Sequence, residues 1–130
     1  MKTTTVWKTG QIFESSYNDQ FQIEIGSGSF SPKALLLSGL AGCAGIDVVM
    51  ILEKMRVPFA NLQIDVETEQ TDGEPKVFKD IMVTFTVKAA EEARDKIKKA
   101  IDLSLEKYCG VAAMLQKHSK IGYNLQLQPE

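Results

Sequence analysis

The feature of this sequence that most limits its fold is one long apolar run. Between residues 34 and 52 the only polar side chains are those of Ser38 and Asp47. Ser31 and Pro32 stand shortly before the run, and these residue types are typical of an N-cap and of the first position of a helix. The sequence therefore predicts a long helix that is apolar on all sides.

Such a helix is either a membrane span or a central helix that is buried all round. The run is long enough to span a bilayer, but Asp47 would be costly in the middle of a span. We favour a central helix that ends near Met55, because Pro58 follows shortly. A chain of 130 residues has few elements to surround such a helix, so a homodimer that buries two copies together is the simplest solution. Glycines at every third position would let another backbone come close: Gly39, Gly42 and Gly45.

Short segments that alternate apolar and polar residues predict β-strands on both sides of this helix. They lie within residues 6–25, 62–69, 81–87 and 121–127. A second helix is expected over residues 91–108. Charged residues fill one of its faces. The other face is formed by Ala93, Ile97, Ala100, Ile101, Ser104 and Tyr108. Because helices and strands do not alternate one for one, we expect a single α+β domain over residues 1–130, with mainly antiparallel pairing.

The charge balance and the residue counts exclude several classes of protein. Fifteen Lys and Arg against 17 Asp and Glu give a formal net charge of −2, which argues against nucleic acid or a membrane surface as a partner. Two cysteines and a single histidine, His118, cannot supply the four ligands of a Cys/His structural zinc site. We expect no metal and no cofactor. The N-terminal residues lack the apolar segment of a signal peptide, so we expect a cytoplasmic protein with reduced cysteines.

The two cysteines are the candidate chemical groups. Cys43 lies inside the apolar run, and Cys109 lies at the end of the second predicted helix. A buried free cysteine is often only a small core hydrophobe, and that interpretation applies to both residues. The spacing is not that of a CxxC motif, so the sequence leaves open whether the two thiols meet.

The segments around both cysteines resemble those of one family. Residues 31–49, SPKALLLSGLAGCAGIDVV, are similar to the first-cysteine helix of the OsmC/Ohr family, the osmotically inducible protein C and organic hydroperoxide resistance proteins. Residues 108–115, YCGVAAML, are similar to its second-cysteine segment. The KMR triplet at 54–56 and the strand expected over 78–89 also fit. The resemblance covers nearly the whole chain and favours an OsmC-like branch over Ohr proper.

This resemblance implies a thiol-dependent peroxidase that takes part in oxidative-stress defence. Cys43 would attack an organic hydroperoxide, or an inorganic one, and become a sulfenic acid. Cys109 would resolve it to a disulfide, which a cellular dithiol reduces. The family fold is an intertwined homodimer in which antiparallel sheets wrap around two central buried helices. An apolar wall on the helix would favour alkyl hydroperoxides, and its expected members are Leu36, Leu37, Leu40 and Ile46.

The sequence departs from the family pattern at two polar positions. The family uses an N-terminal arginine and a glutamate before the first cysteine, whereas this chain has no arginine before Arg56 and carries Lys33 where Ohr proteins have the glutamate. Lys33 would either stabilise the thiolate or point into solvent. Asp47 lies one helical turn after Cys43 and needs a bonded partner if buried. These departures keep open an alternative, an OsmC-fold binding or redox-sensing protein with little turnover, or a dimer whose cysteines are merely packed.

Overall fold

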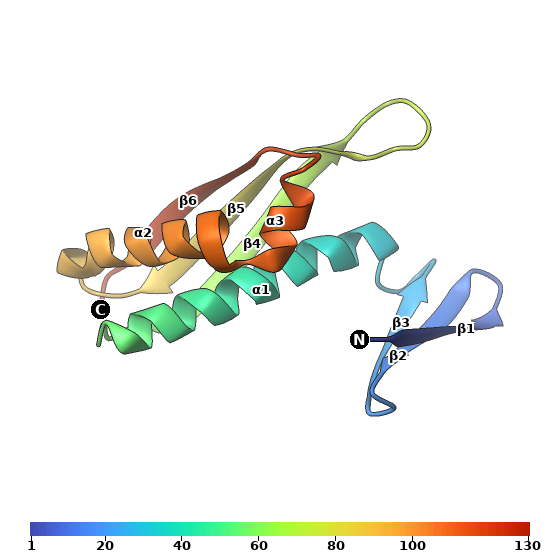
Figure 1. Cartoon of the computed structure of the whole chain (residues 1–130), viewed down its shortest axis with the longest axis horizontal. Helices are drawn as coiled ribbons and strands as arrows, with labels where there is room; N and C mark the ends of the chain where they lie inside the picture. Colours follow the sequence, from blue (N-terminus) through green and yellow to red (C-terminus); the bar gives the residue numbers. More distant parts are fainter. The chain divides into compact units, whose positions relative to one another are not determined.

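The computed structural model describes all residues from Met1 to Glu130, and they separate into two compact units. The N-terminal unit covers Met1–Leu37, and the second covers Ser38–Glu130. The helix α1 (Pro32–Lys54) begins in the first unit and continues through the second (Figure 1). The two units are described one at a time below.

The N-terminal unit is an antiparallel sheet of three strands. In order these are β1 (Thr3–Thr9), β2 (Ile12–Tyr17) and β3 (Phe21–Gly26). The turn between β2 and β3 contains Asn18 and Asp19, both with φ of 55°. These residue types tolerate the left-handed backbone conformation better than most, which explains their use in this turn.

No residue of the N-terminal unit is buried, although its strands carry large apolar side chains. Trp7 is 62% exposed and Phe21 is 63% exposed. The indole of Trp7 donates a hydrogen bond to the carbonyl of Gly10 at 2.9 Å, which fixes the side chain on its own hairpin. This sheet therefore has strong local pairing and no apolar core of its own.

The α1 helix has the predicted boundaries and the predicted cap. Ser31 accepts a hydrogen bond at its Oγ from the backbone of Ala34 at 3.4 Å. At the other end, Arg56 adopts a left-handed φ of 58°, and the Val57 amide bonds the Leu52 carbonyl at 3.0 Å. This pattern is that of a Schellman C-cap. By length and composition α1 is also apolar enough to cross a membrane, a test that a core helix passes equally well.

The second unit packs helices on one face of a three-stranded sheet (Figure 1). Its strands are β4 (Ala60–Gln70), β5 (Phe78–Lys88) and β6 (Ile121–Gln128). Alternate residues of the central strand β5 are buried, as the period of two predicts, and these are Ile81, Val83, Phe85 and Val87. One stripe of α1 covers them with Leu40, Ala44, Val48 and Leu52.

The α+β prediction is confirmed, and so is the mainly antiparallel pairing, with one parallel strand pair. The β4 and β5 strands pair antiparallel, and β6 pairs with β5 in parallel. The parallel pairing arises because the helices between β5 and β6 carry the chain back to the end of the sheet where β5 begins. Alternating strand patterns do not reveal such a crossover. The other three strand pairs are antiparallel, so the pairing is mainly antiparallel as expected.

The helix expected over residues 91–108 is three successive helical segments. A short 3₁₀ turn (Glu91–Ala93) leads into α2 (Arg94–Leu103), and a π-helical turn (Ser104–Tyr108) follows. The α3 helix (Gly110–Leu115) comes next. As predicted, α2 buries Ile97, Ala100 and Ile101. The expectation that Tyr108 shares their buried face is wrong, because Tyr108 is 54% exposed.

Candidate functional site

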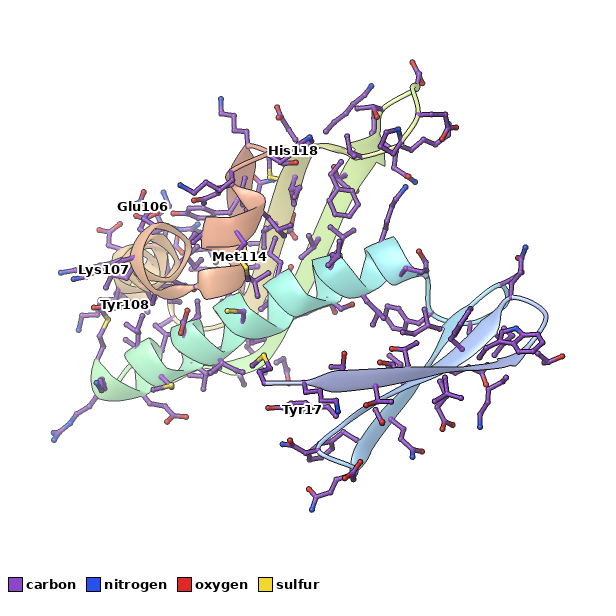
Figure 2. The ribbon with its side chains drawn as sticks, turned by 45° about the vertical axis from the view of Figure 1, so that its right-hand side comes forward. Tyr17, Glu106, Lys107, Tyr108, Met114 and His118 are labelled. Atoms are coloured by element: carbon purple, nitrogen blue, oxygen red, sulfur yellow. The ribbon has the colours of Figure 1, made fainter.

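The π turn decides which residue after Ser104 faces α1. In a regular α-helix the residue one turn after Ser104 would be Tyr108, four positions on. Here the Cys109 amide bonds the Ser104 carbonyl at 2.7 Å, five positions apart. The wider turn leaves Glu106, Lys107 and Tyr108 on its exposed outer side (Figure 2). It thereby carries the thiol of Cys109 to the buried side.

The structure brings both cysteines together with an acidic side chain. Cys43 and Asp47 lie one turn apart on α1, and Cys109 lies just before α3. The two sulfur atoms and a carboxylate oxygen of Asp47 all lie within 4.8 Å of one another. We call these three residues the thiol cluster. The spacing of the two cysteines leaves open whether their thiols meet, and the fold brings them together.

The two thiols differ in exposure. Cys109 is 2% exposed, and its Sγ accepts a hydrogen bond from the Ala112 amide at 3.3 Å. Cys43 is half-buried, and both cysteines are free. Burial and then the neighbouring Cys43 side chain raise the pKa of Cys109 from 9.0 to about 11, although the Ala112 amide lowers it in part. With a pKa of about 11, the Cys109 thiol is protonated at neutral pH.

Asp47 has a bonded partner, and that partner is a neutral hydroxyl. Ser104 is fully buried and donates from its Oγ to Oδ2 of Asp47 at 3.0 Å. The same hydroxyl lies 3.4 Å from the Ala44 carbonyl of α1. Ser104 was expected only as part of a helix face. Its hydrogen bond could have been expected from the sequence, because a hydroxyl on a buried helix face needs a hydrogen-bond partner.

The remaining candidate residues lie outside this cluster. Lys33 lies half-buried in the first turn of α1, within the N-terminal unit. Arg56 is the helix cap described above. Of the residues expected to form an apolar wall, Leu40 is fully buried in the core, so it cannot line an open site, while Ile46 is 65% exposed. His118 is exposed, with its Nδ1 lying 3.1 Å from the Ser119 hydroxyl.

Comparison with known proteins shows the family. The family model described as "OsmC-like protein" matches residues 25–124. Protein YhfA of Escherichia coli K12 is 32% identical over 131 residues, covering 98% of each chain.

Solved structures agree with this assignment. A hypothetical protein from Aquifex aeolicus VF5 superposes with a TM-score of 0.90 at 25% identity, covering 99% of this chain and 96% of the other. The organic hydroperoxide resistance protein OhrB of Bacillus subtilis shares the fold, with a TM-score of 0.64 at 18% identity and coverage of 98% and 96%. The resemblance seen around the two cysteines is confirmed, and the chain belongs to the OsmC family.

Proposed function

We propose that this protein is a thiol-dependent hydroperoxide reductase that uses Cys43 and Cys109. The observation that carries the proposal is the meeting of two free thiols within 4.8 Å, one of them half-exposed and the other buried. Family membership supports a stress-related redox role, since solved relatives include organic hydroperoxide resistance proteins.

The difference between the thiols supports their assignment to two successive steps. The Cys43 thiolate attacks the distal oxygen of the hydroperoxide, and the O–O bond breaks to give a Cys43 sulfenic acid and an alkoxide. The alkoxide takes up a proton and leaves as the alcohol. Cys109 is poorly ionised and shielded, which suits a thiol that acts only once a sulfenic acid lies beside it.

Asp47 supports the second step. As the Cys109 sulfur attacks the sulfenic sulfur, its proton must leave, and the Asp47 carboxylate within the thiol cluster can accept it. The sulfenic hydroxyl takes that proton and departs as water, which leaves a disulfide. An external dithiol then reduces the disulfide and restores both thiols. Because this cycle starts from reduced thiols, it suits the cytoplasm.

The test is hydroperoxide consumption by the reduced full chain with dithiothreitol as the reductant. We expect many turnovers with cumene hydroperoxide in the wild type and none with Cys43→Ser. Cys109→Ser should form one sulfenic acid per chain, trapped by dimedone, without intramolecular disulfide. An absence of turnover in wild-type protein with two titratable thiols would exclude the enzyme.

One specific observation favours a second candidate, a redox sensor. No positive group acts on the Cys109 thiol, and the sequence has no arginine before Arg56 to activate a peroxide. A sensor would form the disulfide once with peroxide and regain its thiols only slowly with dithiothreitol. The same assay separates the two candidates by the number of turnovers.

We further propose that the working form is a homodimer built on the second face of α1. Ile46 is 65% exposed and Met50 is 54% exposed on this helix, so a single chain leaves that apolar face uncovered. The exposed apolar side chains of the N-terminal sheet also support association with a second copy.

A further inference from the structure

The thiol cluster offers three metal-binding donors from two separate elements. Cys43 and Asp47 come from α1, and Cys109 comes from the segment between the π turn and α3. Their donor atoms lie within 4.8 Å of one another. Zn–S bonds of about 2.3 Å place two thiolates of a tetrahedral site roughly 3.8 Å apart, so side-chain movements of about 1 Å are enough to bring the donors to a common ion.

We propose that the thiol cluster is a binding site for a thiophilic divalent cation, for which Zn²⁺ is the representative. The ligands are the Cys43 thiolate, the Cys109 thiolate and one carboxylate oxygen of Asp47, and water completes the tetrahedron. Each thiol that binds the ion gives up its proton, with no change in oxidation state. The proposal goes beyond the peroxidase cycle, because it needs the same residues but not their redox chemistry.

The chemistry of the donors fits such an ion. Two thiolates favour soft and borderline cations over Mg²⁺ and Ca²⁺, which prefer all-oxygen sites. The cluster has no positive group acting on its buried thiol, and a bound cation supplies that charge. The counts of Cys and His residues exclude only a structural zinc site whose four ligands are of those two types. The fold adds a carboxylate as third ligand, which a count of those two residue types leaves out.

The surroundings of the cluster already orient its donors. The Ser104 hydroxyl donates to Oδ2 of Asp47 at 3.0 Å, which fixes the orientation of the carboxylate beside the two thiols. The Ala112 amide at 3.3 Å from the Cys109 sulfur stabilises the thiolate that a metal requires. Hydrogen bonds of this kind to metal ligands fix their orientation and raise metal affinity about 10-fold to 100-fold.

Metal binding and disulfide formation exclude one another in this arrangement. A disulfide brings the sulfurs to about 2.05 Å and uses the electron pairs that a cation would need. Zn²⁺ therefore protects the reduced form and halts the redox cycle, while oxidation of the thiols expels the ion. The cluster would thus respond both to peroxide and to available metal.

The experiment titrates the reduced, metal-free full chain with Co²⁺ and then displaces Co²⁺ by Zn²⁺. We expect one ion per chain, a thiolate-to-cobalt charge-transfer band in the near ultraviolet and the visible bands of a tetrahedral site. Cys43→Ser and Cys109→Ser should each remove at least half of the charge-transfer intensity. Asp47→Asn should weaken Zn²⁺ binding at least tenfold in competition with a chromophoric chelator. His118→Ala is the matched control and should leave the affinity unchanged.

A second measurement on the wild type does not depend on how the variants fold. Zn²⁺ should slow the alkylation of both thiols at least tenfold, and disulfide-bonded protein should bind no Co²⁺. The proposal is overturned if Co²⁺ gives no charge-transfer band, or if His118→Ala abolishes binding. A protein that turns over peroxide but binds no metal would refute only this inference. A protein that binds metal but lacks turnover would refute only the proposed function.

Discussion

Ser104 holds a position where a small polar side chain has a large effect. Its hydroxyl is fully buried and is the donor to the Asp47 carboxylate. A carboxylate in a half-buried place needs such a donor, because losing one leaves the group poorly solvated. In the proposed mechanism the serine touches no reacting atom and acts as a positioning residue for Asp47.

We predict that Ser104→Ala destabilises the fold by about 1–3 kcal/mol, because it leaves the Asp47 carboxylate without its donor. Urea unfolding followed by circular dichroism measures the change. Ser16→Ala is the control. Ser16 lies in the N-terminal sheet, and its hydroxyl makes only a long hydrogen bond of 3.5 Å to the Thr4 carbonyl. In the double variant with Asp47→Asn the loss should be smaller than the sum of the single losses. Strict additivity would show that the pair does not interact.

Tyr123 on β6 makes another hydrogen bond to a carboxylate in the second unit. Its hydroxyl donates to Oδ1 of Asp102 at 2.8 Å. Burial first, and this hydrogen bond second, raise the pKa of Tyr123 from 10.0 to about 12. The folded state therefore holds the phenol proton more tightly than the unfolded state does. The stabilisation is complete below pH 10 and is lost as the pH rises towards about 12.

Tyr123→Phe tests this linkage. At pH 7 we expect the variant to be less stable than the wild type by about 1 kcal/mol, because the hydrogen bond is lost. The difference should shrink between pH 10 and pH 12, where the wild type alone loses the contribution of this phenol. Chemical unfolding at a series of pH values measures both curves. A difference that stays constant over this range would contradict the assigned shift.

At the scale of elements, one glycine of α1 lies directly against a side chain of β4. A Cβ at Gly45 would lie 2.9 Å from Cδ1 of Ile64, whereas Cβ atoms at Gly39 and Gly42 would meet nothing within 4 Å of them. The three glycines of the expected row therefore differ in their surroundings. Gly45 accommodates a strand side chain of the same chain, while the other two positions remain open.

Gly45→Ala measures this contact. The helix gains about 1 kcal/mol from alanine, and the displaced Ile64 side chain offsets the gain, so we expect little net change. Ile64→Val removes the Cδ1 atom in question. In that background the alanine should stabilise the protein by about 1 kcal/mol, as thermal and urea unfolding would show. The same effect of alanine in both backgrounds would mean that no contact exists.

Sequence patterns were sufficient for α1 and for most strands, because capping residues and alternation act locally. The cap at Ser31 and the buried stripe of β5 follow directly from such patterns. They were insufficient for the π turn, since a turn closed by a bond five positions apart leaves no mark in composition. The sequence could thus name Cys43 and Cys109, but only the fold shows that Ser104 and Asp47 are joined beside them.

At the scale of the whole molecule, a single chain buries only one stripe of α1. The core of the second unit uses Leu40, Ala44, Val48 and Leu52, and the N-terminal sheet contributes no buried residue. Large exposed apolar surfaces in a soluble chain indicate an interaction site. Each unit therefore leaves apolar side chains exposed to solvent, and this is the physical basis of the proposed dimer.

Ile46→Lys tests that assembly. A lysine on the uncovered face of α1 should shift the protein towards monomer, because a charge cannot be buried in an apolar interface without a partner. Sedimentation equilibrium should show a dissociation constant raised at least tenfold. Asn124→Lys is the control, since Asn124 lies exposed on the polar face of β6 and should not alter the assembly. A wild type that is monomeric at every concentration tested would refute the dimer.

The π turn has a consequence for how this chain can change in length. It places one extra residue between Ser104 and Cys109 compared with regular helical spacing. Deletion of one of those intervening residues would let the helix close normally and place the cysteine four positions after Ser104, on the same side of the helix as now. A chain so shortened would keep the cysteine on the buried side, whereas the present spacing in an unbroken α-helix would turn Cys109 about 100° away from it. Among relatives, a cysteine four positions after this serine in a regular helix and one five positions after it in a π turn would therefore occupy the same place.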